Sequence, residues 1–121
     1  MMTRPAILSS GSLEITVDQR GNDRLVRVSG RINVDSSPDL RDRLQVILSE
    51  QTVPRSVTVD LSRVPYIETS GVATLIEALR IARHRQISLR LQGLSGPALR
   101  LFEVTGVRAL FERSDRGQKV N

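Results

Sequence analysis

The sequence contains no cysteine, one histidine and three aromatic residues, and each shortage excludes a class of function. Without cysteine there is no disulfide, no catalytic thiol and no cysteine-ligated zinc site. His84 stands alone, so a histidine-rich metal site is impossible. We therefore expect neither a metal site nor any other cofactor.

Long apolar runs are also missing. The first residues, MMTRPAILSSGS, lack the apolar core of a signal peptide, and no run approaches membrane-spanning length. We expect a cytoplasmic protein without membrane insertion. The 121 residues are 39% apolar and 26% charged, which is typical of one soluble globular domain.

The net charge of +5 does not indicate a nucleic-acid binder. Lys119 is the only lysine, and the arginines are dispersed from Arg4 to Arg116 among acidic residues. A nucleic-acid surface usually gathers its basic residues on one face, with aromatic residues if it stacks on single strands. Tyr66 is the only tyrosine, and we place both phenylalanines in the core. Nucleic-acid binding is the weakest alternative, and the Arg80–Arg85 cluster is interpreted as a solvated helix face.

Alternation of apolar and polar residues predicts four strands. A turn at Arg20–Asp23 joins the first two as a hairpin. The apolar positions are Leu13, Ile15 and Val17, then Val26 and Val28, then Val57, Val59 and Leu61, and finally Ile87, Leu89 and Leu91.

Helical spacing predicts three helices. The first begins at Ser36–Asp39 with a proline in its first turn, the central one runs from about Glu68 to Arg85, and the third opens at Ser95–Pro97 and closes at Gly106. The segment Val107–Phe111 is interpreted as either a strand or a helical turn. The expected apolar stripes are Leu40, Leu44, Ile47 and Leu48, then Val72, Leu75, Ile76 and Leu79, then Leu99 and Phe102.

The element order β-β-α-β-α-β-α predicts an α/β fold. Strands separated by helices pair in parallel through right-handed crossovers, whereas the opening hairpin is antiparallel. We expect a mixed sheet of four to five strands with helices packed on it. The single domain covers residues 1–121, with an ordered core at about 13–112 and polar ends at 1–10 and 113–121.

The stretch Val57–Arg85 organises this fold and carries the candidate site. Thr69 and Ser70 lie at the predicted start of the central helix. A helix start has unpaired N–H groups and partial positive charge, so it favours a hydroxyl acceptor or a phosphate. The two hydroxyls are either simple helix caps or a docking site that also caps.

Catalytic constellations are missing. The sequence has no P-loop and no Gly-x-Ser-x-Gly elbow. His84 lies about 20 Å from Ser70 along the predicted helix, too far for a base to activate a nucleophile. We expect a protein that is not an enzyme.

Three segments together resemble the STAS domain of anti-anti-sigma factors. The stretch DLSRVPYIETSGV at Asp60–Val72 is similar to the family's central motif. Gly30-Arg31-Ile32-Asn33 resembles a Gly-Glu-Leu-Asp corner after the second strand, and Leu101–Val107 resembles a Leu-Phe-x-x-x-Gly-Leu segment. The similarity spans about residues 13–112, and most of the family's last helix is expected to be missing.

This resemblance implies a partner that is both a kinase and an anti-sigma factor, and that itself binds ATP. Thr69 matches the phosphorylated position, and Ser70 is the second choice. Glu68 stands for the family's aspartate, and Arg31 and Asn33 replace acidic residues of the corner. The implied partner-binding residues are Arg31, Asn33, Asp35, Glu68, Thr69, Ser70, Gly71 and Val72.

The same family suggests an alternative function. STAS modules also serve as the cytoplasmic subunit of lipid-transport ABC systems, in which a threonine at the matching place contacts the ATPase. In that case the partner is an ABC transporter ATPase, and phosphorylation plays no role. The Glu68-Thr69-Ser70 variant fits both functions about equally well.

Overall fold

The computed structural model describes residues 13–120, so the predictions for residues 1–10 and for Asn121 lie outside it. Within this range the chain forms four strands and four helices. They are β1 (Glu14–Arg20), β2 (Asp23–Ser29), α1 (Ser37–Leu48), β3 (Ser56–Arg63), α2 (Thr69–His84), β4 (Ser88–Gln92), α3 (Gly96–Val104) and α4 (Val107–Val120).

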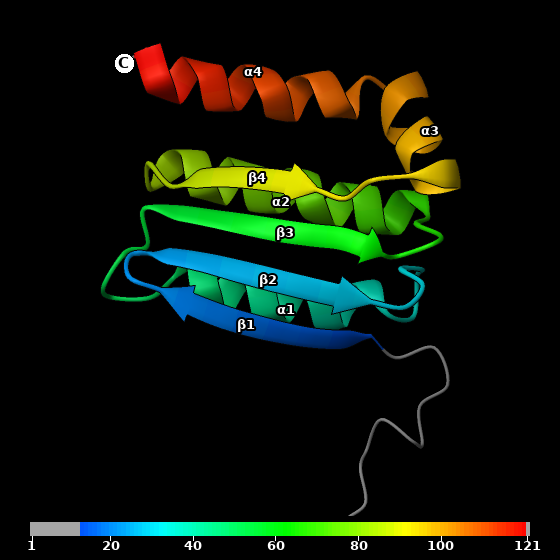
Figure 1. Ribbon diagram of the computed structural model, residues 1–121, viewed down its shortest axis with the longest axis horizontal. Helices are drawn as coiled ribbons and strands as arrows, with labels where there is room; N and C mark the ends of the chain where they lie inside the picture. The colour runs from blue at the N-terminus through cyan, green and yellow to red at the C-terminus, as the bar shows by residue number, and fades with distance from the viewer. Residues whose placement is uncertain (1–12, 121) are drawn as a thin grey trace, which may run out of the picture.

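The strands form one mixed sheet in the order β1-β2-β3-β4. β1 and β2 pair antiparallel as a hairpin, whereas β2, β3 and β4 run parallel to one another. α1 and α2 are the crossovers, and both lie behind the sheet in Figure 1. The predicted α/β class, the opening hairpin and the predicted order up to α3 are confirmed. The sheet of the described residues has four strands, within the predicted range of four to five.

The core lies between the sheet and these two helices. The inward-facing residues of β3, which are Val57, Val59 and Leu61, are at most 1% exposed. The predicted stripe of α1 is confirmed, and in α2 only Ile76 of the predicted stripe is partly exposed. Both helices therefore bury one face, as the helical spacing predicted, and this holds the start of α2 at the carboxyl end of β3 (Figure 1).

The C-terminal helix is the main difference from the sequence-based prediction. Val107–Phe111 is the first part of α4, and the expectation that most of the last helix is missing is wrong. Val107 and Phe111 are one turn apart and buried, and they anchor the helix. Arg108 forms ion pairs with Glu112 and Glu103 at 3.4 and 2.9 Å. Once the apolar turn is docked, each further residue adds a backbone hydrogen bond, so the helix can continue into the polar sequence that follows.

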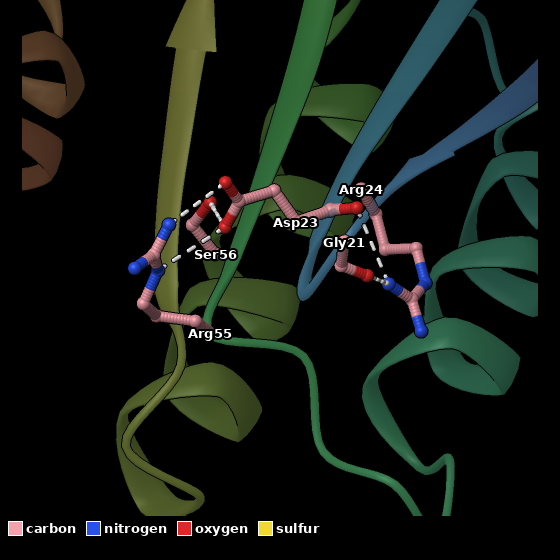
Figure 2. Close-up of polar contacts among 5 residues, drawn as sticks. All are labelled: Gly21, Asp23, Arg24, Arg55 and Ser56. Atoms are coloured by element: carbon pink, nitrogen blue, oxygen red, sulfur yellow. Dashed lines mark hydrogen bonds and ion pairs between the residues drawn. The ribbon is translucent and has the colours of Figure 1, made fainter.

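A polar cluster joins the hairpin to β3 at the amino-terminal end of β3 (Figure 2). The Asp23 carboxylate accepts hydrogen bonds from the Ser56 hydroxyl at 2.8 Å and from the Arg55 guanidinium at 3.0 Å. The buried Arg24 donates to the carbonyl of Asp23 and pairs with Glu50 at 2.9 Å. This cluster ties the β-hairpin to β3 and to the end of α1.

The Asp23 cluster predicts a pH-dependent stability. The hydrogen bond from Arg55, followed by that from Ser56, lowers the pKa of Asp23 in the folded state. A carboxylate with a lowered folded pKa stabilises the fold above its unfolded pKa, and this contribution is lost as the pH falls through the folded pKa. We expect Asp23→Asn to lower the urea midpoint at pH 7, and we expect this loss to shrink as the pH falls through the lowered folded pKa of Asp23. An Asp42→Asn control on the exposed face of α1 should show no such dependence on pH. A difference in midpoint between wild type and Asp23→Asn that stays constant as the pH is lowered would contradict the prediction.

Candidate functional site

Two chain segments meet where β2 and β3 end, on the right of Figure 1. We call residues 30–36 and 64–72 together the corner. Gly30 has a φ of 118°, a conformation that favours glycine, and its N–H donates to the Arg63 carbonyl at 3.1 Å. Ile32 and Ile67 form a parallel bridge. The N–H of Ile32 donates to the Tyr66 carbonyl at 3.0 Å, so the two segments are fixed side by side.

The first segment of the corner is held by its own side chains. The amide oxygen of Asn33 accepts hydrogen bonds from the N–H groups of Asp35 and Ser36, both at 2.9 Å. The buried Ser36 hydroxyl donates to the Arg31 carbonyl at 2.7 Å. An amide oxygen accepts these bonds as a carboxylate would, so the turn at position 33 does not require a negative charge.

The start of α2 lacks the side-chain capping that both interpretations of its hydroxyl groups assume. Glu68 is the N-cap residue, Thr69 and Ser70 are the first two helical residues, and no side chain caps the helix. The predicted capping role of these hydroxyls is therefore wrong, because both residues already lie inside the first turn. Thr69 is exposed, whereas the Ser70 hydroxyl oxygen is buried and has no hydrogen-bond partner among the described residues. Of the two, Thr69 is the one a modifying enzyme can reach.

Gly71 and Val72 are buried and do not offer side chains to a partner. A Cβ atom at Gly71 would lie 2.4 Å from Cγ2 of Ile32 and 2.7 Å from Cγ1 of Ile67. A side chain here would force apart the two segments that the bridge joins, as the sequence analysis expects of a close-approach glycine. These two residues shape the corner from inside, and the exposed members of the predicted set are Arg31, Asp35, Glu68 and Thr69.

Asp60 fixes the last part of β3. Its carboxylate accepts the N–H of Ser62 at 3.0 Å, and this hydrogen bond lowers the pKa of Asp60. A Cβ atom at Gly93, after β4, would lie 2.8 Å from the same carboxylate oxygen. The ends of β3 and β4 are therefore closely packed, and this gives the corner a rigid support.

Two exposed apolar side chains belong to the corner and were not among the predicted partner-binding residues. Tyr66 is 53% exposed and Val34 is 68% exposed. The guanidinium carbon of Arg31 lies 5.4 Å from the centroid of the Tyr66 ring, a cation–π contact worth about 0.5–1 kcal/mol at an exposed site. The available signal was the placement of the only tyrosine in the short connection between a strand and a helix.

The corner offers an exposed surface and an exposed hydroxyl group, and none of its residues is a histidine. His84 ends α2 and lies at the other end of that helix from Thr69. Among the described residues no group of histidine, aspartate and glutamate side chains is placed to hold a metal ion. Within the same part of the chain no helix is both long and apolar enough to cross a membrane. The geometry fits recognition by another macromolecule.

Comparison with known proteins places this chain in a family. The family model described as "Mlab, STAS domain" matches residues 15–112. The chain belongs to the STAS domain family. The anti-sigma-B factor antagonist of Bacillus subtilis (strain 168) is 30% identical over 107 residues, which are 88% of this STAS domain and 95% of the relative.

Solved structures show the same fold. An anti-sigma factor antagonist from Mycobacterium paratuberculosis matches with a TM-score of 0.67 at 21% identity, over 85% of this chain and 86% of that one. The Bacillus cell fate determinant SpoIIAA in its phosphorylated form matches with a TM-score of 0.58 at 15% identity, over 77% and 84% of the two chains. The family model and the relative from Bacillus subtilis confirm the predicted resemblance to the STAS family, and these structures agree with its fold.

Proposed function

We propose that this STAS domain is an anti-sigma factor antagonist, a regulatory binding protein that docks on an anti-sigma factor through the corner. The observation that carries this proposal is the exposed Thr69 at the start of α2, beside a loop fixed by its own hydrogen bonds. The relative from Bacillus subtilis bears the name of such an antagonist and matches almost its whole length to this chain. A rigid, partly apolar surface suits docking because little conformational entropy is lost on binding.

The proposed partner is both an anti-sigma factor and a serine/threonine kinase that binds ATP. The Thr69 hydroxyl oxygen attacks the γ-phosphorus of ATP, the bond between the β,γ-bridging oxygen and that phosphorus breaks, and ADP leaves. The hydroxyl proton passes to a base of the kinase. Ser70 is the less suitable acceptor because its hydroxyl oxygen is buried.

The phosphate changes the surface and leaves the fold unchanged. It adds about −1.5 to −2 charges at pH 7 and three acceptor oxygens. The uncapped first turn of α2 tolerates this charge within the protein because its N–H groups and the helix dipole favour an anion. A partner packed closely against Thr69 does not tolerate it, because burying an unpaired charge is costly. Phosphorylation therefore releases the partner.

Affinity capture from lysate of the source bacterium tests this function. The immobilised proteins are the wild type, Thr69→Glu and Thr69→Ala. We expect the wild type and Thr69→Ala to retain a kinase-like anti-sigma factor. Thr69→Glu should retain at least about ten times less of this anti-sigma factor than the wild type does, because a like charge or an unpaired charge at an interface costs several kcal/mol.

Thr52→Glu is the matched control. Thr52 is exposed and lies in the connection before β3, at the end of the sheet opposite the corner, so the same change of charge there should leave retention unchanged. Equal retention by wild type and Thr69→Glu would contradict the docking site. Capture of an ABC transporter ATPase in place of the kinase would instead support the lipid-transport alternative.

A further inference from the structure

We propose that Arg31 is the residue of this chain that binds the phosphate group on Thr69, and that it leaves the Tyr66 ring when it does so. The inference deepens the proposed function and rests on it only in taking Thr69 as the phosphorylated residue. It starts from the contact between Arg31 and Tyr66 in the unmodified protein.

The backbone of the corner holds Arg31 close to the start of α2. Ile32, the next residue, makes hydrogen bonds to the two chain neighbours of Ile67. Its N–H donates to the Tyr66 carbonyl, and its carbonyl accepts the N–H of Glu68 at 2.8 Å. The carbonyl of Arg31 is fixed by the Ser36 hydroxyl. The backbone therefore cannot drift away from Thr69, whereas the long side chain is exposed and makes no hydrogen bond or ion pair among the described residues.

The phosphate is the stronger of two competing partners for this side chain. A guanidinium can donate two parallel hydrogen bonds to a phosphate, and charge-assisted bonds of this kind are about twice as strong as neutral ones. The contact with the exposed Tyr66 ring offers no hydrogen bond. The only other charges of the corner are acidic, at Asp35 and Glu68, and Arg63, the last residue of β3, lies outside it. Arg31 is therefore the only cation of the corner, and we assign it to the phosphate.

This movement has a consequence for docking. In the unmodified protein the stacked guanidinium keeps the Tyr66 ring in one place, which makes the ring a pre-organised contact for the partner. When Arg31 turns to the phosphate, the ring loses this support and becomes more accessible to solvent. Phosphorylation then disturbs an apolar contact as well as adding charge.

The test uses the full chain with phosphothreonine genetically encoded at position 69, alone and combined with Arg31→Gln. The second pKa of the phosphate, near 6 in an unperturbed group, is measured by phosphorus NMR titration. We expect it to be higher in Arg31→Gln than in the parent by about half a unit, because a nearby cation favours the doubly charged form. Asp35, Glu68 and Arg63 also act on this group, but they are the same in both proteins.

Arg80→Gln is the matched control, because it also removes one positive charge. Arg80 lies on α2 about 16 Å along the helix from Thr69, which is beyond the Debye length of about 8–10 Å. Tyr66 supplies the second measurement, because it is the only tyrosine and there is no tryptophan. Acrylamide should quench its fluorescence more in phosphorylated than in unphosphorylated wild type, with no such difference in the Arg31→Gln background.

Each outcome can be assigned. Equal phosphate pKa values with and without Arg31, or unchanged quenching on phosphorylation, would overturn the role of Arg31. Because neither measurement uses a partner, these results would leave the proposed docking function in place. If instead both shifts are seen but Thr69→Glu still retains every captured protein, the role of Arg31 stands and the docking function fails.

Discussion

Replacing Tyr66 with alanine is expected to weaken binding of the proposed anti-sigma factor partner by about 2 kcal/mol or more, roughly 30-fold in Kd. The ring is half exposed, lies within three residues of Thr69 and is stacked under Arg31. Tyrosine is, with tryptophan and arginine, among the residue types enriched at the positions that dominate interfaces. Its ring buries a large area at a small cost in side-chain entropy, because it has only two side-chain torsions. Isothermal titration with the purified partner measures the change.

Two variants separate this role from a loss of apolar surface in general. Tyr66→Phe keeps the ring and should bind within a few-fold of wild type. Val104→Ala removes an apolar side chain that is 74% exposed at the end of α3 and does not belong to the corner, so it should not alter Kd. Unchanged binding by Tyr66→Ala would mean that the interface is centred on other residues of the corner.

The fold was predictable because its periodic segments are long and the connections between them carry strong turn and cap residues. Val57, Val59 and Leu61 alternate in β3 exactly where the sheet faces α1 and α2, and one-residue slippage would expose all three. α4 was missed because its second half is polar and has no periodic apolar stripe. Its formation depends on docking of Val107 and Phe111, which is a tertiary effect that local sequence does not contain.

The site was predictable in position and less so in detail. The motif around Thr69 places the hydroxyl at the end of β3, and the resemblance added the loop from Arg31 to Asp35. The sequence could not tell that Glu68 is the N-cap residue, because a shift of one residue at a helix start changes which side chains can reach the free N–H groups. Val72 is buried, as the helical spacing predicted, although the resemblance counts it among the partner-binding residues. The sequence did not indicate that Val34 is exposed.

The largest loss of stability is expected for Phe102→Ala. Phe102 is fully buried in α3, and truncation of such a side chain costs about 3–5 kcal/mol because transfer energy and packing are both lost. That is a large share of the roughly 5–15 kcal/mol that stabilises a domain of this kind. Urea unfolding followed by circular dichroism should show a much lower midpoint, with the slope of the transition unchanged.

The same substitution also tests whether the corner is independent of the C-terminal helices. α3 lies beyond β4, whereas the corner is built on β2, β3 and α2 (Figure 1), so the folded fraction of Phe102→Ala should bind the partner with the wild-type Kd. Val104→Ala in the same helix should cost less than about 0.5 kcal/mol, because that side chain is already exposed. Equal destabilisation by the two variants would contradict the burial of Phe102. A weakened Kd in folded Phe102→Ala would mean that α3 transmits its packing through β4 and Gly93 to Asp60, and so to the corner.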